Sequence, residues 1–238
     1  MTSAYDCNVV IDLEFTPVPK ALQDGTGLRQ EIIEVGAVKL DPEGNVVAEF
    51  SHMVRPTLAR SVSGQVRSLT GIVNGDIACA RPLEDVIGAL AAWIGPCRAR
   101  MVTWSGCDWK QIRTELDAKG IQCALPHRWM DIQPLYAHFM GLPRKKVALC
   151  EAADWLGIPN DRSRAHRALY DAQITREVFS MMASGDLAEH RRRVRLETSK
   201  ARHAAACSAS IGSRCGGLAD LLASLVAKEA QAGVAHAC

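Results

Sequence analysis

Two carboxylates lie close together in a stretch that otherwise has the character of a buried strand. Asp12 and Glu14 are separated by one residue within Asn8–Phe15, which is otherwise largely β-branched or apolar. Alternate residues of a strand point to the same face, so the two acids share a face. Like charges this close repel each other unless a cation lies between them, and a divalent metal ion is the simplest one. The pair therefore predicts metal-assisted phosphoryl chemistry.

A second pair of the same spacing shows why context matters. Asp41 and Glu43 lie in the segment 41–45, Asp-Pro-Glu-Gly-Asn, between two strand-like runs. Proline, glycine and asparagine between two strands are typical of a solvated hairpin turn. We therefore expect no chemistry from the second pair.

The composition indicates a soluble protein with a sizeable core. Of the 238 residues 48% are apolar, yet no apolar run approaches the roughly 18 residues of a membrane span. Met1 to Asp6 lack the charged and apolar regions of a signal peptide. The nine cysteines are scattered without a Cys-x-x-Cys pair, which is typical of reduced thiols. We therefore expect a cytoplasmic protein with no membrane partner.

The first part of the chain predicts an antiparallel meander. Three strand-like runs cover 8–15, 31–40 and 46–54, and a longer loop covers 16–30 beside the acid pair. Beyond them strands alternate with helices, which indicates parallel strands covered by helices. We expect strands at 100–104 and 128–132, and helices at 82–94, 108–118, 134–140, 146–155 and 165–183. Together these elements predict an α/β fold with a ribonuclease H-like mixed five-stranded sheet flanked by helices.

This fold brings two further acids and a histidine toward the first pair. Asp108 follows the strand that ends at Trp104, in the first turn of the next helix. Asp171 lies early in the last helix of the domain, five residues after His166. Four carboxylates offer the hard oxygen ligands that Mg²⁺ and Mn²⁺ prefer, and a histidine can accept a proton near neutral pH.

These residues together resemble the DEDDh, or DnaQ-like, family of 3′ to 5′ exonucleases. The three blocks of that family occur in order at 10–16, 102–108 and 165–171. Supporting matches lie at 31–38, 68–72 and 156–158, so the resemblance covers roughly residues 7–183. The sister DEDDy branch has a tyrosine four residues before its last acid, where this chain has Arg167. The resemblance therefore implies that His166 is the general base.

The resemblance also implies a role for each acid in a mechanism with two divalent ions. Asp12 would bridge both ions, Glu14 and Asp171 would help to hold the ion that carries the attacking water, and Asp108 would support the second ion. His166 would take the proton from that water. The expected catalytic residues are thus Asp12, Glu14, Asp108, His166 and Asp171, with the four acids as metal ligands.

The middle block indicates a branch of the family. Thr103-Trp-Ser-Gly-Cys-Asp108 is similar to the branch that contains KapD and the ERI-1-like RNA exonucleases, although Ser-Gly-Cys replaces the more usual Gly-Asn/Asp-x. This similarity favours single-stranded RNA 3′ ends as the substrate and nucleoside 5′-monophosphates as the products. Two alternatives stay open, namely a DNA-directed proofreading or repair exonuclease and a nonhydrolytic RNA-binding regulatory protein.

Several apolar residues are candidates for contacts with the 3′-terminal nucleoside. Three follow the first acid, two match the base-wedging segment of the family, and one could stack on a base; they are Leu13, Phe15, Thr16, Leu69, Ile72 and Trp104. Core packing is the alternative for Leu69, Ile72 and Trp104. Basic side chains at 144–146 and at Arg162, Arg164 and Arg167 could hold phosphates or lie on a solvated surface.

We expect an exonuclease domain over 1–184 and a basic, amphipathic helical extension over 185–238. The extension carries a basic run at 191–202 and then an apolar stripe at helical spacing, Leu218, Leu221, Leu222, Leu225 and Val226. The basic run could add RNA affinity, whereas the stripe could dock on the domain or on a second subunit. Self-association in the wider family favours a homodimer.

Overall fold

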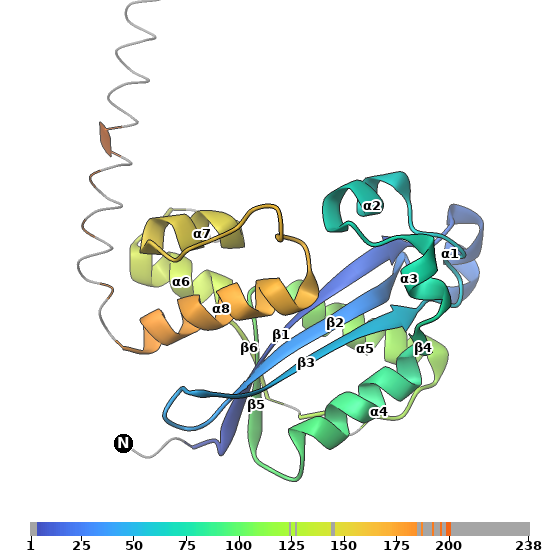
Figure 1. Cartoon of the computed structure of the whole chain (residues 1–238), viewed down its shortest axis with the longest axis horizontal. Helices are drawn as coiled ribbons and strands as arrows, with labels where there is room; N and C mark the ends of the chain where they lie inside the picture. Colours follow the sequence, from blue (N-terminus) through green and yellow to red (C-terminus); the bar gives the residue numbers. More distant parts are fainter. Residues whose placement is uncertain are drawn as a thin grey trace, which may run out of the picture. The chain divides into compact units, whose positions relative to one another are not determined.

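The computed structural model (Figure 1) describes residues 4–123, 125–126, 128–143, 146–184, 187, 192, 196 and 199–200. Contacts divide the chain into two units, Met1–His190 and Arg191–Cys238, and nearly all the described residues belong to the first. The leucine stripe at 218–226 and most of the basic run lie outside the described residues. The domain boundary at residue 184 and the helical extension therefore stay predictions.

A mixed six-stranded sheet forms the centre of the first unit, in the order β4-β3-β2-β1-β5-β6. The strands are β1 (Cys7–Pro17), β2 (Gln30–Leu40), β3 (Val46–Arg55), β4 (Arg81–Pro82), β5 (Ala99–Thr103) and β6 (Trp129–Asp131). The first three form the expected antiparallel meander, and β5 and β6 add to it in parallel. The α/β ribonuclease H-like fold is confirmed. The predicted five strands were one too few, because the two residues of β4 are too short to show a periodicity.

Eight helices are described in the first unit. They are α1 (Lys20–Thr26), α2 (Gly64–Thr70), α3 (Asn74–Ala78), α4 (Leu83–Ile94), α5 (Gly106–Lys119), α6 (Gln133–Met140), α7 (Leu149–Leu156) and α8 (Ala168–Ala183). The region expected as a loop at 16–30 contains the short helix α1, and α8 begins later than residue 165. Among the described residues, no helix combines the length and the apolar character needed to cross a membrane.

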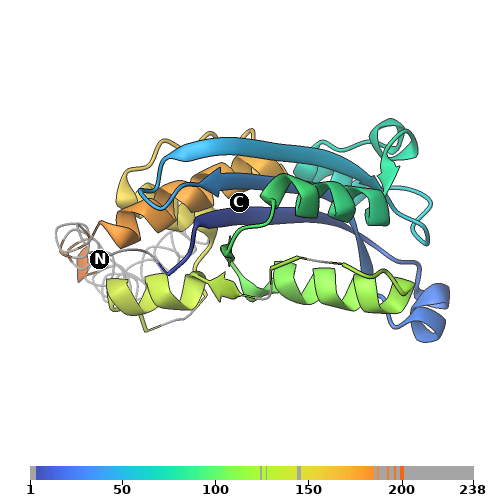
Figure 2. The same ribbon diagram turned by 90° about the horizontal axis from the view of Figure 1, so that it is seen from below.

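The two faces of the sheet carry different helices (Figures 1 and 2). Odd-numbered residues of β1 face α4 and α5 in the main core, which includes Val9, Ile11 and Leu13. The even-numbered residues of β1 point to the opposite face, where α8 packs along β1 and β2. This alternation places Asp12 and Glu14 on the face that α8 covers.

The pairing of β1 with β2 fixes the neighbours of both acids. Asp12 lies opposite Gly36 and Glu14 lies opposite Glu34. After Glu14 the register shifts, so that Phe15 pairs with Ile32. Such a bulge changes the direction of the strand and is common beside functional sites.

Candidate active site

Asp12 and Glu14 occupy the centre of the sheet. Glu14 is only 8% exposed, and Asp12 is half-buried. Both lie on β1, where β2 pairs with the strand on one side, whereas the pairing with β5 on the other side covers only Cys7–Val10. Acids this deeply placed on a central strand need a compensating cation or a proton.

Asp108 reaches the pair from the start of α5. Strand β5 ends at Thr103, and the hydroxyl of Ser105 accepts a hydrogen bond from the backbone N–H of Cys107 (3.3 Å) as the helix begins. Asp108 is 5% exposed, and the backbone of Leu13 lowers the pKa of its carboxyl group. The charge of Asp108 in turn raises the pKa values of Asp12 and Glu14, so the third acid lies close to the first two.

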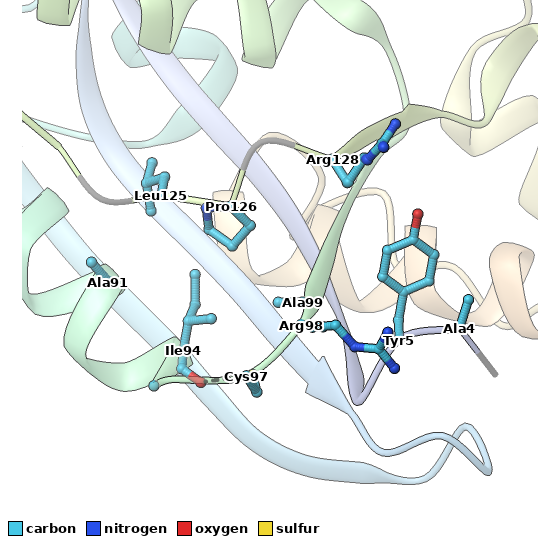
Figure 3. A pocket seen from close by; sticks show the side chains of 11 residues that line it. Ala4, Tyr5, Ala91, Ile94, Cys97, Arg98, Ala99, Leu125, Pro126 and Arg128 are labelled. Carbon is cyan, nitrogen blue, oxygen red and sulfur yellow. Dashed lines mark hydrogen bonds between the residues drawn. The ribbon is translucent and has the colours of Figure 1, made fainter.

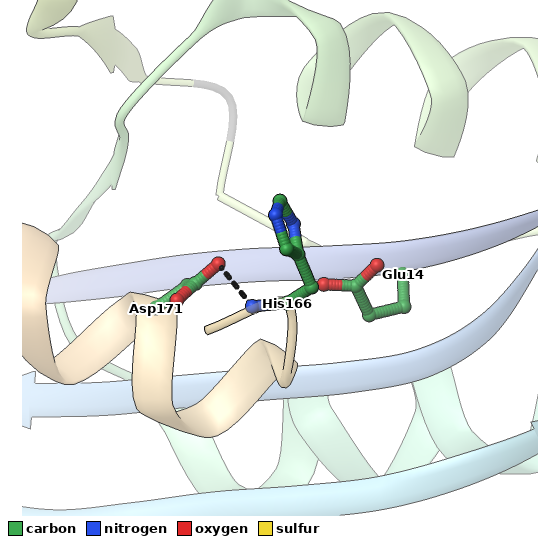
Figure 4. Close-up of side chains that lie close together, drawn as sticks. All are labelled: Glu14, His166 and Asp171. Atoms are coloured by element: carbon green, nitrogen blue, oxygen red, sulfur yellow. Dashed lines mark hydrogen bonds between the residues drawn. The ribbon is translucent and has the colours of Figure 1, made fainter. Parts of the chain in front are cut away.

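His166 lies in the loop before α8, and Asp171 lies in the first turn of α8 (Figure 4). The carboxylate of Asp171 accepts a hydrogen bond of 3.1 Å from the backbone N–H of His166. One ligand atom from each of Glu14, His166 and Asp171 lies within 4.8 Å of the other two. His166 is exposed and has φ 62°, the one positive φ among the described non-glycine residues. The structure thus brings Glu14 of β1 next to His166 and Asp171 from the end of the domain. Their roles in catalysis and metal binding stay predictions.

Burial and mutual repulsion raise the pKa values of the four acids. Burial raises the pKa of Asp12 well above its usual range, and the charge of Asp108 adds to this. Burial and the charge of Asp171 raise the pKa of Glu14 to about 8, and burial raises the pKa of Asp108 to about 7. The pKa of Asp171 is raised by burial in spite of the hydrogen bond from His166. Each carboxylate charge is therefore costly here unless a cation joins the site.

The donor set fits a divalent metal. The four acids offer hard oxygen ligands, and the Glu14, His166 and Asp171 atoms are close enough to share an ion. Arg167 is the cation that lowers the pKa of Glu14, but its guanidinium is bound to Glu34. Because Arg167 is paired with Glu34, its charge only partly offsets the charges of the four acids.

The residues expected to contact the nucleoside differ widely in exposure. Leu69 is 52% exposed on α2, and Phe15 is half-buried beside the acids. Leu13, Thr16 and Ile72 are each at most 3% exposed. Leu69 and Phe15 thus have the more accessible side chains of the set, although Phe15 also packs against the main core. Contact of any of these residues with a base stays a prediction.

Trp104 has the surroundings of a packed residue. It is 7% exposed, its indole N–H donates to the carbonyl oxygen of Val147 (3.0 Å), and its ring centroid lies 5.5 Å from that of Tyr136. These contacts favour the packing role that was the alternative for this residue. The hydroxyl of Tyr170, the residue before Asp171, accepts a hydrogen bond from the backbone N–H of Asp161 (2.6 Å).

The basic residues near the histidine loop are partly engaged. Arg162 pairs with Asp154, and the guanidinium carbon of Arg164 lies 4.5 Å from the ring centroid of Tyr170. Arg167 is bound to Glu34. Of the run at 144–146, only residue 146 is described.

Two supporting acids were not singled out from the sequence. Glu34 lies beside Glu14 and binds Arg167, and Asp131 accepts the backbone N–H groups of Gly106 (3.0 Å) and Gln133 (3.1 Å). Asp131 thereby holds the start of α5, which carries Asp108. The available signal was the position of each acid within or at the end of a strand-like run.

Two cavities differ in their relation to the acids. A cavity of about 270 Å³ is lined by His166 and Asp171 and extends toward the start of α7. A larger one of about 620 Å³ lies where β1 and β5 begin, beside Tyr5, Arg98 and Arg128 (Figure 3). The larger cavity contains none of the four acids, so size alone does not identify the site.

Comparison with known proteins gives a family match and several relatives. Residues 9–179 match the family model RNase_T, described as Exonuclease. The chain is 27% identical over 175 residues to the probable 3′-5′ exonuclease KapD of Bacillus subtilis (strain 168), covering 73% of this chain and 83% of KapD. It is also 27% identical over 174 residues to the PolC-type DNA polymerase III of Thermotoga petrophila, covering 72% of this chain but only 11% of the polymerase.

A solved structure gives the same picture of the fold. The nuclease domain of 3′hExo, a DEDDh family member bound to rAMP, is similar with a TM-score of 0.67 and 24% identity. The similarity covers 78% of this chain and 96% of that domain. The mixed sheet and its flanking helices are thus those of a known nuclease fold.

Proposed function

Because this chain belongs to the exonuclease family, we propose that it removes nucleotides one at a time from the 3′ end of single-stranded RNA. It is a 3′-5′ exonuclease hydrolase, and exonucleases of this kind use divalent metals. The observation that carries the proposal is the convergence of Asp12, Glu14, Asp108, His166 and Asp171 from three separate segments. The expected products are nucleoside 5′-monophosphates.

The four acids would hold two Mg²⁺ or Mn²⁺ ions. Bound metal would supply charge neutralisation at the phosphodiester and activation of water. The raised pKa values of Asp12 and Glu14 support this role, because a site that disfavours its own charges gains from binding cations. Asp108, from the first turn of α5, and Asp171, from the first turn of α8, would be the other two ligands.

His166 would act as the general base. His166 is exposed and its ring lies beside Glu14 and Asp171, where a water held by the acids would be within reach. Loss of a positioned base costs roughly 10² to 10⁴ in rate. His166→Ala should show this loss under single-turnover conditions while Mn²⁺ binding persists. If His166→Ala keeps more than half of the activity, the base is another group.

Two observations bear on the choice of nucleic acid. The block Thr103–Asp108 is similar to the branch with RNA exonucleases, and 3′hExo was solved with rAMP. The relationship to a PolC-type DNA polymerase supports a DNA-directed exonuclease as the second candidate. We favour RNA because Thr103–Asp108, the block that contains one of the four acids, is similar to the branch with RNA exonucleases.

A matched-substrate assay tests the proposal. The protein is incubated with 5′-labelled single-stranded RNA and DNA of one sequence, each with Mg²⁺, Mn²⁺ or EDTA. We expect a ladder shortened from the 3′ end on RNA, a slower one on DNA and none in EDTA. A ladder on DNA alone would establish the second candidate. Binding without shortening in either metal would instead indicate a nonhydrolytic RNA-binding protein.

A further inference from the structure

Glu34 is a buried acid that lies beside the metal-binding acids but has its own partners. It is 2% exposed and lies opposite Glu14 across the β1–β2 pair. Its carboxylate accepts hydrogen bonds from Arg167 at Nη2 (2.8 Å) and Nε (3.1 Å), and from the backbone N–H of Ala168 (3.0 Å). A planar guanidinium that donates through two nitrogens fixes direction as well as distance.

These bonds hold the segment that follows His166. Arg167 and Ala168 are the next two residues, and Ala168 is the first residue of α8. On the other side, the backbone N–H of His166 donates to Asp171 (3.1 Å). His166 is therefore fixed from two directions, by Asp171 at its own backbone and by Glu34 through its neighbours.

The backbone of His166 needs such support. Its φ of 62° lies in the left-handed region, which a residue with a side chain adopts at some cost unless the surroundings impose it. The nearby close packing of α8 on β2 adds to the constraint. An ideal Cβ on Gly36 would lie 2.0 Å from the backbone nitrogen of Leu169, so only glycine allows this approach.

We propose that Glu34 is a positioning residue, which holds the His166 ring over the metal-binding acids through Arg167 and Ala168. This inference rests on the proposed role of His166 as the general base. Glu34 itself would neither bind metal nor exchange a proton. Its oxygen atoms already accept hydrogen bonds from Arg167 and Ala168, so little of the carboxylate is left for an ion.

Glu34→Gln tests this role, because the amide keeps the size of the side chain but places donor hydrogens against the donors of Arg167. We expect kcat on a saturating short RNA with Mn²⁺ to fall about 10- to 100-fold, the range seen when a supporting partner is lost. KM and Mn²⁺ affinity should change by less than about threefold, because the four acids are intact. Glu34→Asp should restore part of kcat.

Glu49→Gln is the matched control. Glu49 is an exposed acid on β3 that accepts a hydrogen bond from Gln173 of α8 (2.8 Å), so the same substitution removes a strand-to-α8 contact outside the histidine loop. It should leave kcat unchanged. Arg167→Lys is the second test variant, because lysine keeps the charge on a half-exposed side chain but cannot form the two-nitrogen contact. It should lower kcat in the same way even if Glu34→Gln fails to fold.

A double variant separates positioning from a merely structural role. If Glu34 acts only through His166, then Glu34→Gln should cost nothing further once His166 is alanine. Equal losses in the two backgrounds, or a fall in Mn²⁺ affinity, would overturn the proposal. His166→Ala at near full activity would refute the general-base role instead. If His166→Ala is slow but Glu34→Gln and Arg167→Lys are both fully active, only the positioning role of Glu34 is refuted.

Discussion

Asp12 shows what it costs to gather four acids around one strand. Burial and the charges of Asp108 and Asp171 raise its pKa, which means that the folded protein without metal disfavours the ionised form. The same charge is needed to hold metal. The ionised form of Asp12 therefore favours the proposed metal binding but destabilises the metal-free protein.

We predict that Asp12→Asn is inactive, yet melts at a higher temperature than the unmodified protein in EDTA. The amide removes one repelling charge from the cluster and keeps the shape of the side chain. Isothermal titration with Mn²⁺ should show lost or greatly weakened binding, and thermal unfolding in EDTA should show the stabilisation. A variant that hydrolyses RNA at the normal rate with Mg²⁺ would remove Asp12 from the metal site.

The sequence was informative about the acids that are expected to bind metal, and less so about an acid that binds other groups of the protein. Asp12, Glu14 and Asp171 stood out because their types and spacing match one chemistry. Glu34 lies in an equally apolar strand, but its partner Arg167 is 133 residues away along the chain. A buried acid can bind a metal ion or can hold another part of the protein in place. Only the folded chain shows which partner lies beside it.

At the scale of elements, the close approach of α8 to β2 depends on a single missing side chain. We predict that Gly36→Ala destabilises the protein by at least about 1–3 kcal/mol, the usual cost of overpacking. The reason is that the added Cβ would lie 2.0 Å from the backbone nitrogen of Leu169, and backbone cannot rotate away. Unfolding in urea measures the change.

Gly88→Ala supplies the control for that substitution. Gly88 is exposed within α4, and an added Cβ would meet nothing within 4 Å. Alanine should there stabilise the helix by up to about 1 kcal/mol. Equal effects of the two substitutions would show that the approach of α8 is not as tight as the structure indicates.

A second element-scale contact joins β2 to α5 and to the segment after β3. Glu31 is fully buried and accepts hydrogen bonds from Lys119 Nζ (2.7 Å) and from the backbone N–H groups of Thr57 (2.8 Å) and Ala59 (2.6 Å). Burial opposes the charge of Glu31, but the bonds from Lys119, Ala59 and Thr57 outweigh it and lower its pKa. A lowered carboxyl pKa stabilises the fold above the unfolded-state pKa and loses this effect as pH falls through the folded-state value.

We therefore predict that Glu31→Gln lowers the free energy of unfolding by about 1.5–3 kcal/mol at pH 7, the usual worth of a charged hydrogen bond. The difference between the unmodified protein and the variant should shrink below about pH 4, where the unfolded carboxyl protonates. Urea unfolding across pH 3 to 8 measures it. Glu43→Gln, in the exposed turn after β2, should show no such difference at any pH. A pH-independent difference for Glu31→Gln would contradict the role of its charge.

Element boundaries were less predictable than element types. The meander and the alternating half of the fold followed from hydrophobic periodicity, which long buried strands show clearly. The strand β4 and the helices α1, α2 and α3 were missed, because elements of two to seven residues are too short to show a period. The start of α8 was placed too early, because the tertiary bonds of Glu34 and Asp171 hold residues 166 and 167 outside the helix.

At the scale of the whole molecule, the candidate catalytic groups are confined to the first unit. Asp12, Glu14, Asp108, His166 and Asp171 all lie within Met1–His190, and Leu187 is 6% exposed among the described residues. A chain shortened to residues 1–190 is therefore a better test than one that ends at 184. We predict that it cleaves a saturating short RNA at close to the rate of the full chain.

The residues removed, 191–238, carry both the basic run and the leucine stripe, and the two features predict different losses. Burial of Leu218, Leu221, Leu222 and Leu225 would contribute about 1.5–3 kcal/mol per side chain, so their removal should lower the melting temperature or dissociate a dimer. Phosphate contacts by the basic run would instead contribute about 0.7 per phosphate to the slope of log K against log salt. We predict that removal of 191–238 lowers the melting temperature or dissociates a dimer and leaves the salt slope unchanged. Thermal unfolding, sedimentation and RNA binding at several salt concentrations measure these three quantities. An unchanged melting temperature and oligomeric state with a flatter salt slope would assign this segment to RNA binding instead, because a charge contact is screened by salt whereas an apolar one is not.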